Sequence, residues 1–251
     1  MYLRTRHDID VHVDETGDGE PVLYLHSGPG RGGDWRGVVE CLGPSRRHIF
    51  PDLYDRGRSG RWPNEATYSL DRQAEMASDV IDAHGGRAHV VGHSYGGAVA
   101  VRLAVLSPER VASLTAIEPQ LIDLLRDAGD AEFHASVIET YGAILGALST
   151  GDDERGWTLF IDEFNGRGAW AGLPDKVKNR VRAQGPRMPV YVAALRDNPV
   201  GVSDVAGLDA ATLVILGANT SPLNGGWRRS WLKMRRVRPA SRSKTRRTWP
   251  L

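Results

Sequence analysis

Cysteine is almost absent: the 251 residues contain one, Cys41. A single cysteine forms no internal disulfide, and without cysteine neighbours it builds no thiolate zinc site. We therefore expect Cys41 to be a core residue, and we expect neither a metal nor a cofactor.

No apolar run approaches the ~20 residues that span a bilayer, and the first six residues lack the apolar region of a signal peptide. The sequence thus predicts a cytoplasmic protein with no membrane partner.

Acidic residues are absent from the last 25 positions. Residues 227–251 contain ten Arg or Lys and no Asp or Glu, which leaves 22 basic and 31 acidic residues in residues 1–226, a net charge of −9. This abrupt change from an acidic, patterned domain to a basic, unpatterned segment favours a frameshifted or replaced C-terminus. A basic tail that binds nucleic acid or anionic lipid is the second interpretation.

One stretch reads as strand, tight turn and helix. Residues 88–91 form a short apolar run typical of a strand, and residues 98–106 carry the apolar spacing of a helix. Ser94 stands at the corner between them, with Gly92 and Gly96 two residues away on each side. A sharp turn needs glycine there because a Cβ would keep strand and helix apart. The pattern predicts the G-x-S-x-G nucleophile elbow.

An elbow of this kind predicts an oxyanion site. The turn raises the Ser94 hydroxyl above the sheet, and the Tyr95 amide at the start of the helix can donate to a developing negative charge. A second donor is expected from the Gly-rich loop 26–33, which follows the apolar strand 21–25. If that strand lies beside the elbow strand, the amide of Gly28 faces the same corner.

The remaining pattern alternates strands with helices, which implies a mainly parallel sheet. Residues 52–60 are expected to be a tight surface loop whose charges hold it by hydrogen bonds. Residues 120–204 are helical in pattern, with aromatics that belong mostly to the core and in part to a pocket. We expect an early antiparallel strand at residues 8–14, buried strands at 21–25, 48–51, 88–91, 111–117 and 211–217, and helices at 35–42, 70–84 and 98–106.

The sequence resembles the α/β-hydrolase superfamily over roughly residues 8–222. The resemblance rests on His26-Ser27-Gly28-Pro29-Gly30, on residues 52–60, on Gly92-His93-Ser94-Tyr95-Gly96-Gly97, and on the late strand 212–217. It implies the α/β-hydrolase fold, a mainly parallel sheet with helices on both faces and a helical cap insertion. It also implies that Ser94 is the nucleophile and that the amides of Tyr95 and Gly28 form the oxyanion hole.

The same resemblance implies a division of the chain. Residues 1–119 and 205–226 would form the α/β-hydrolase core, residues 120–204 the helical cap, and residues 227–251 a basic irregular tail. The tail begins where the family has a final helix, strand and histidine loop. We therefore expect that last strand and histidine loop to be missing.

The acid of a family triad usually follows the late strand, but residues 217–222 contain no carboxylate. Some members place it at the end of the strand after the elbow helix, where Glu118 stands. A carboxylate there can orient an imidazole and stabilise its charged form. The resemblance thus implies Glu118 as the acid, with the alternative that Glu118 only anchors the first turn of the cap.

The family takes its catalytic histidine from a loop near the C-terminus, and here no histidine follows His134. His26 is expected to be structural, His93 to point away and support the turn, and His134 to lie within the cap. None of the three is expected to be a good substitute base.

The leading hypothesis is a serine hydrolase that acts on a small ester-like or related carbonyl substrate through a Ser94 acyl-enzyme, weakened by the lack of the histidine. The second is a non-catalytic ligand-binding protein that keeps the pocket without the triad. Nucleic-acid binding through the tail ranks last. Neither the identity of the substrate nor the oligomeric state follows from the sequence.

Overall fold

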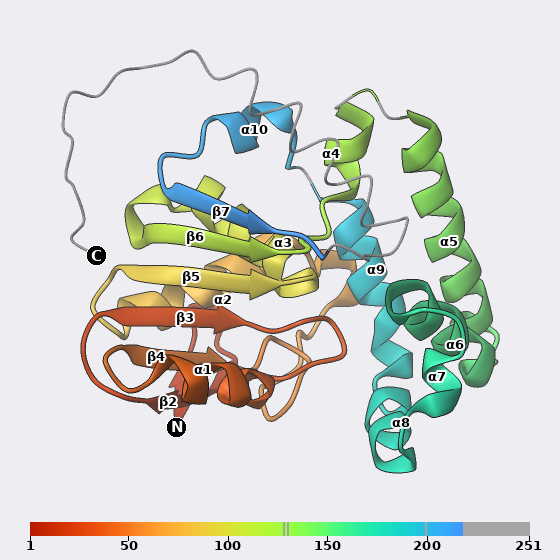
Figure 1. The fold of residues 1–251 in the computed structure, drawn as a ribbon, viewed down its shortest axis with the longest axis horizontal. Helices are drawn as coiled ribbons and strands as arrows, with labels where there is room; N and C mark the ends of the chain where they lie inside the picture. Colours follow the sequence, from red (N-terminus) through yellow and green to blue (C-terminus); the bar gives the residue numbers. More distant parts are fainter. Residues whose placement is uncertain (128, 130, 199, 218–251) are drawn as a thin grey trace.

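The computed structural model describes residues 1–127, 129, 131–198 and 200–217. Within them seven strands form one sheet, namely β1 (Tyr2–Arg4), β2 (Asp10–Thr16), β3 (Pro21–Leu25), β4 (Arg47–Pro51), β5 (Ala88–His93), β6 (Val111–Ile117) and β7 (Ala211–Ile215). Their order across the sheet is β1-β2-β4-β3-β5-β6-β7 (Figure 1). β2 runs antiparallel to β1 and β4, and the other neighbours run parallel. The predicted α/β fold class is confirmed.

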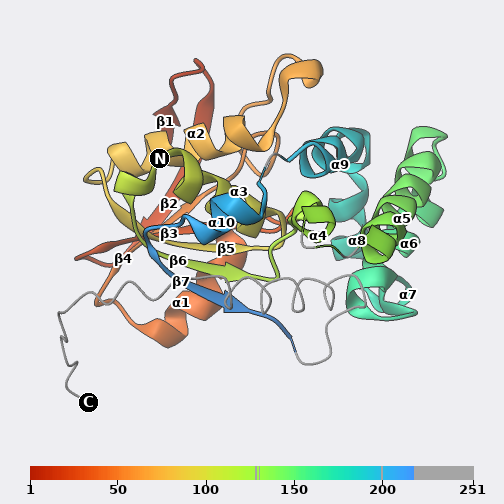
Figure 2. The same cartoon turned by 90° about the horizontal axis from the view of Figure 1, so that it is seen from above.

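Helices cover both faces and one end of the sheet. They are α1 (Arg36–Leu42), α2 (Leu70–Asp82), α3 (Tyr95–Leu106), α4 (Ile122–Asp127), α5 (Ala131–Ser149), α6 (Asp153–Asn165), α7 (Ala169–Gly172), α8 (Asp175–Arg182), α9 (Met188–Arg196) and α10 (Val202–Ala206). α2, α3 and α10 lie on one face of the sheet and α1 on the other (Figure 2). α5 to α9 gather beyond the carboxyl ends of the parallel strands (Figure 1).

Most of the predicted elements are present with small shifts. α2 begins at Leu70, and its start is capped by the Ser69 hydroxyl, which accepts a hydrogen bond from the Arg72 amide at 3.4 Å. The early antiparallel strand begins at Asp10 instead of residue 8, because Asp8 adopts a positive φ of 61° in a turn. The helical character of residues 120–204 is confirmed, whereas their separation as a cap domain stays a prediction.

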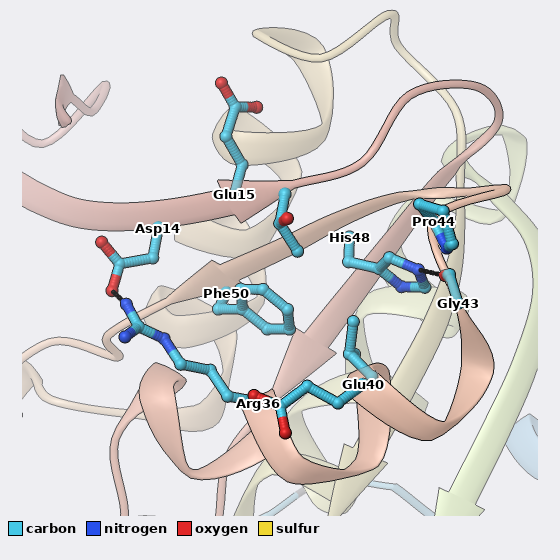
Figure 3. A pocket seen from close by; sticks show the side chains of 10 residues that line it. Asp14, Glu15, Arg36, Glu40, Gly43, Pro44, His48 and Phe50 are labelled. Carbon is cyan, nitrogen blue, oxygen red and sulfur yellow. Dashed lines mark hydrogen bonds and ion pairs between the residues drawn. The ribbon is translucent and has the colours of Figure 1, made fainter.

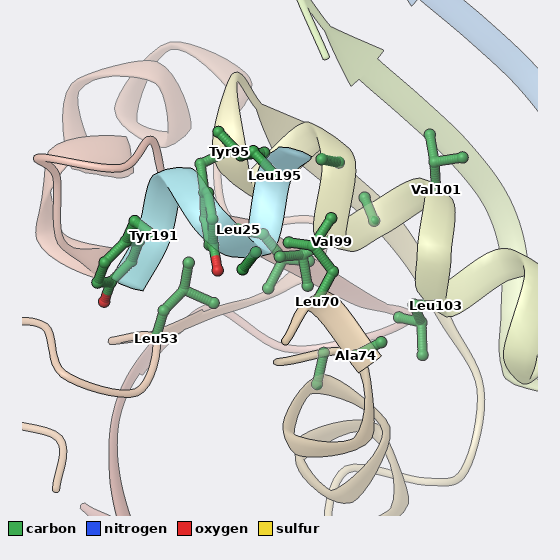
Figure 4. Close-up of a cluster of buried hydrophobic side chains, with 14 of the residues drawn as sticks. Leu25, Leu53, Leu70, Ala74, Tyr95, Val99, Val101, Leu103, Tyr191 and Leu195 are labelled. Carbon is green, nitrogen blue, oxygen red and sulfur yellow. The ribbon is translucent and has the colours of Figure 1, made fainter. Parts of the chain in front are cut away.

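The core lies between the sheet and the helices, and it extends to the helices at the strand ends. Tyr191 and Leu195 of α9 face Tyr95 at the start of α3, beside the cluster of Leu, Val and Ala side chains beneath α3 (Figure 4). Cys41 was expected in this core and is instead exposed. α1 buries one residue, Val39, and Cys41 two positions later faces solvent.

The late strand is present as β7, but the prediction that it is buried is wrong in the described structure. β7 is the edge strand of the described sheet. Its alternate side chains Leu213 and Ile215 are 56% and 42% exposed. Because successive strand residues face opposite sides, these two share one face. The predicted tail and the predicted loss of a further strand lie outside the described residues.

Within the described residues, no helix combines the length and the apolar character needed to cross a membrane.

Candidate active site

Ser94 occupies the corner between β5 and α3, as predicted. Its backbone has φ 55° and ψ −116°, a region that side chains other than glycine rarely adopt. The Ser94 amide donates to the Ile117 carbonyl on β6 at 2.9 Å, and the Ser94 carbonyl accepts from Ala98 on α3 at 3.1 Å. These bonds hold the strained conformation from both sides. Backbone strain of this kind is concentrated at functional sites.

The glycines of the elbow are needed for close backbone approach. A Cβ on Gly92 would lie 2.2 Å from the Gly96 carbonyl oxygen. A Cβ on Gly96 would lie 2.3 Å from the Leu25 carbonyl oxygen and 2.4 Å from that of His26. Because every one of these atoms belongs to the backbone, no side-chain rotation relieves the clash. The G-x-S-x-G spacing thus lets α3 start directly against β3 and β5.

Ser94 opens into a cavity of about 340 Å³ between the strand ends and the helices beyond them. Polar side chains from the core line one part of it, and apolar side chains of α6 to α8 line the other. The lining residues are Ser27, Pro29, Gly30, Asp34, His93, Ser94, Glu118, Gln120, Phe160, Ile161, Phe164, Asn165, Ala169, Leu173, Val177, Arg180 and Val181. A cavity of this size takes a small molecule with an apolar part.

Behind Ser94 lies a second, much smaller cavity of about 20 Å³. Gly28 and Tyr95 line it together with Ser94. The expectation that the strand before Gly28 lies beside the elbow strand is confirmed, because β3 pairs in parallel with β5 and Leu25 is opposite Gly92. The structure thus brings together the three residues predicted to form the nucleophile and the oxyanion hole.

Glu118 lines the larger cavity with Ser94. It directly follows β6 and has a positive φ of 45°, so the ends of the two neighbouring strands β5 and β6 carry two strained residues side by side. One carboxylate oxygen of Glu118 accepts a hydrogen bond from the Gly217 amide at 3.0 Å. The position agrees with the predicted acid, and the catalytic role stays a prediction.

His26 is held in a structural role, as expected. Its Nε2 accepts a hydrogen bond from the Leu53 amide at 3.0 Å, so the proton of the neutral ring lies on Nδ1 and is donated to the Ser27 carbonyl at 2.7 Å. Burial lowers the pKa of His26 to about 4. Since both ring nitrogens are occupied, His26 has no lone pair for a proton from Ser94.

His93 lines the larger cavity together with Ser94 and Glu118. The predicted direction of its side chain stays a prediction. Burial lowers the pKa of His93, and the nearby Glu118 charge acts in the opposite direction. His134 lies on α5 with Nε2 3.9 Å from the Asp123 carboxylate. Among the eight histidines, all of which are described, His93 is the one that lines the Ser94 cavity.

The loop at residues 52–60 is held partly as predicted. The Asp52 carboxylate accepts hydrogen bonds from the Gly32 amide at 2.8 Å and the Arg58 amide at 2.9 Å. The loop is not a surface loop throughout, because its first half, including Leu53 and Tyr54, is buried in the core. The charges of this half therefore contact the interior.

Arg56 is the residue of this loop that sequence reasoning missed. It is 2% exposed, and its Nε and Nη1 have no hydrogen-bond partner. Its Nη2 lies 3.9 Å from the Met188 sulfur, and its guanidinium carbon lies 3.5 Å above the centre of the Tyr191 ring. Both partners come from α9, far along the chain, so no local signal could have shown the burial of this charge.

A further cavity of about 470 Å³ lies between β2, β4 and α1 (Figure 3). Three of its four charged side chains are already paired, since Asp14 bonds Arg36 at 2.7 Å and Glu15 bonds Arg47. His48 is likewise held there, by the Gly43 carbonyl at 3.1 Å. Within the described part of the chain, no cluster of three His, Cys, Asp or Glu side chains is placed to hold a metal ion.

The structure combines a strained serine corner, a mainly parallel sheet and helices over the strand ends. Comparisons with known proteins find the same fold in α/β hydrolases. A family model described as the alpha/beta hydrolase fold matches residues 20–140. An alpha/beta hydrolase from Sphaerobacter thermophilus matches the structure with a TM-score of 0.68 at 21% identity, over 93% of this chain and 87% of that one. Residues 20–140, just under half of the chain, thus match this family, and the described structure has the α/β-hydrolase fold.

Characterised relatives match a shorter stretch. A 2-hydroxymuconate semialdehyde hydrolase from Pseudomonas sp. (strain CF600) is 40% identical over 110 residues, which are 42% of this chain and 38% of that protein. A pimeloyl-[acyl-carrier protein] methyl ester esterase from Nitrosomonas europaea is 38% identical over 107 residues, 43% of this chain and 40% of that protein. The match thus spans about two fifths of the length of these relatives.

Proposed function

We propose that this chain is a serine hydrolase that acts on a small ester or a related carbonyl compound. The observation that carries the proposal is the strained backbone of Ser94, at a corner where Gly28 and Tyr95 line the same small cavity. The names of the relatives, a hydrolase and an ester-cleaving esterase, support the same reaction class.

In the proposed reaction, Ser94 Oγ attacks the carbonyl carbon while its proton passes to a base. The amides of Tyr95 and Gly28 bind the negative oxygen of the tetrahedral intermediate. The intermediate collapses with loss of the alcohol, which takes up the proton, and leaves an acyl group on Ser94. A water molecule then attacks this ester and releases the acid.

The proposed mechanism needs a base that takes the Ser94 proton. Because His26 is occupied and His134 lies away from the cavity, we assign the base role to His93, with Glu118 as the acid that stabilises its charged form. Burial keeps His93 neutral near pH 7, as a base requires. No histidine is hydrogen-bonded to the Ser94 hydroxyl within the described residues, so we expect slow turnover.

Hydrolysis of p-nitrophenyl hexanoate by the purified chain and by Ser94→Ala tests this proposal. We expect slow release of p-nitrophenolate that Ser94→Ala abolishes. Loss of a triad member leaves only about 10³ to 10⁴-fold acceleration over water. Hydrolysis that persists unchanged in Ser94→Ala would refute the proposal.

Within the described residues the Ser94 hydroxyl has no hydrogen-bonded base, which also favours a second candidate, a protein that binds a carbonyl compound in this cavity without turnover. Stabilisation of the fold by methyl hexanoate, with no hydrolysis of any ester and no acylation of Ser94, would favour this second candidate.

A further inference from the structure

Within the described residues, Arg56 is a buried positive charge whose guanidinium has no hydrogen-bond acceptor other than a thioether. Arginine remains protonated in proteins, and an isolated ion in the interior is strongly unfavourable unless it is paired. A buried polar group that lacks a hydrogen bond needs an explanation, such as a bound ion or a functional role. Two of the three guanidinium nitrogens of Arg56 lack any acceptor, and the third contacts only a thioether, a weak acceptor.

Within the described residues, no carboxylate is hydrogen-bonded to Arg56. The side chain of the adjacent Asp55 is fully buried, and its carboxylate accepts the Trp62 amide at 3.0 Å and pairs at 2.7 Å with Arg187. Arg187 also pairs with Glu65. Neutral tyrosines lie beside Arg56. Burial raises the pKa of Tyr95 well above its ordinary value, and the Arg56 charge acts in the opposite direction. The Arg56 charge therefore lies close to the elbow residue Tyr95, and no described carboxylate accepts a hydrogen bond from it.

Arg56 lies directly behind the wall of the small cavity beside Ser94. Both of its contacts, Met188 and Tyr191, line that cavity. Tyr191 and Tyr95 face each other across it, with ring centres 4.9 Å apart. An acyl group on Ser94 that enters this cavity points toward the Met188 and Tyr191 wall. Methionine is unbranched and readily adopts other rotamers, so Met188 can move aside and expose the guanidinium.

We propose that Arg56 binds a carboxylate at the far end of the acyl chain, so that the substrates are esters of acids carrying a second, free carboxylate. This substrate class rests on the proposed serine hydrolase function. A carboxylate suits the planar guanidinium fork. The cavity of about 20 Å³ has room for about one water molecule, so the carboxylate reaches Arg56 only when Met188 moves aside. The bound carboxylate supplies the acceptors that Arg56 lacks.

Two esters of equal chain length test the proposal. Mono-p-nitrophenyl adipate and p-nitrophenyl hexanoate both have six-carbon acyl chains, and only the adipate ends in a carboxylate. We expect the wild-type chain to release p-nitrophenolate from the adipate at least about tenfold faster, the effect of one charged hydrogen bond. Arg56→Met should bring the ratio of the two rates close to one, and Arg56→Lys should keep part of the preference.

Arg102→Met is the matched control. Arg102 is another largely buried arginine, but it is fully paired, with bonds of 2.6 and 3.0 Å to Asp71. We expect this variant to lose stability and keep the adipate preference. If Arg102→Met and Arg56→Met lower the preference equally, the ratio reports stability and the proposal is wrong.

The stability of the free protein separates a binding role from a structural one. Replacing an unpaired buried charge with an apolar side chain is neutral or stabilising. We therefore expect Arg56→Met to unfold at the same temperature as the wild-type chain or at a higher one. A variant that unfolds at a clearly lower temperature would show that Arg56 only anchors Tyr191 of α9.

Binding without chemistry separates this proposal from the hydrolase function. In a Ser94→Ala background, calorimetry with monomethyl adipate should give an affinity that Arg56→Met lowers by about tenfold or more. Methyl hexanoate should bind weakly and be insensitive to the change. If neither ester acylates Ser94 but monomethyl adipate still binds through Arg56, the hydrolase proposal fails and the subsite stands. Ser94-dependent hydrolysis without any Arg56 effect would overturn the subsite alone.

Discussion

The core side and the cap side of the Ser94 cavity are built differently. On the core side, backbone groups at the ends of β3, β5 and β6 place Ser94, and glycines allow the close approach. On the cap side, apolar side chains of α6 to α8 form the wall, and they follow no motif. Backbone geometry tolerates little change, whereas a wall of side chains tolerates much. The comparison indicates that the backbone of the core side fixes the position of Ser94, whereas the side chains of the cap side shape the apolar part of the cavity.

Adding a methyl group to a glycine on the core side should cause the largest loss of stability. In Gly96→Ala the new Cβ meets two backbone carbonyls within 2.4 Å, so β3 and α3 must separate. We expect a loss of about 3 kcal/mol or more in the free energy of unfolding, measured in urea. Gly37→Ala on α1 is the control, since a Cβ there meets nothing within 4 Å. It should stabilise the chain by about 0.5–1 kcal/mol. Equal effects at both glycines would contradict this account.

The buried His26 on the core side predicts a pH dependence of stability. Its pKa falls from about 6.5 in the unfolded chain to about 4 in the folded one. The unfolded state thus binds more protons between these values, so stability is full above pH 6.5 and falls as the pH approaches 4. The loss attributable to His26 is about 3 kcal/mol. Urea unfolding measured across this range should show it, and His26→Asn should weaken the slope. If the pH dependence of the free energy of unfolding is the same in His26→Asn, it does not come from His26.

Loss of the proposed base should slow the reaction without unfolding the protein. For His93→Gln we expect acylation of Ser94 to slow by about a hundredfold, a typical contribution of a general base. The rate should also lose its dependence on pH near the pKa of His93, which burial places below its ordinary value. His134→Gln is the control on the cap side and should change the rate little. Equal rates for His93→Gln and the wild-type chain would assign the base elsewhere.

The cap side should respond to substitution by a change in preference. Phe164, from α6, lines both cavities. We expect Phe164→Ala to shift the preference toward longer esters by about tenfold or more, since one methylene in an apolar pocket changes selectivity by about 1–3 kcal/mol. The comparison of p-nitrophenyl acetate, hexanoate and decanoate measures this. An unchanged order of the three rates would show that Phe164 does not limit the acyl chain.

The sequence predicts the core side well because its signals are local. The elbow at Ser94 depends on two glycines within five residues, and the position of Glu118 follows from the end of an apolar strand. Parallel pairing then brings these strand ends together, since all carboxyl ends meet at one edge of the sheet. The same reasoning recovered the α/β fold class and the capped start of α2.

The residues that escaped prediction depend on distant packing. Arg56 is buried because Met188, 132 residues further along, closes over it. Cys41 is exposed because α1 presents only one residue to the core. His93, the last residue of β5, lines the cavity with Glu118, and this meeting depends on the pairing of β5 with β6 and not on a local motif. Whether Glu118 acts as the acid depends on chemistry that no pattern of residues establishes.

A covalent trap of Ser94 tests the central claim most directly. The purified chain is incubated with a fluorophosphonate, and peptide mass spectrometry then locates the adduct. We predict a single adduct on the peptide that contains Ser94, no adduct in Ser94→Ala, and slower labelling in His93→Gln. An intact Ser94 peptide after prolonged incubation with folded protein, or equal labelling of Ser94→Ala, would contradict the account.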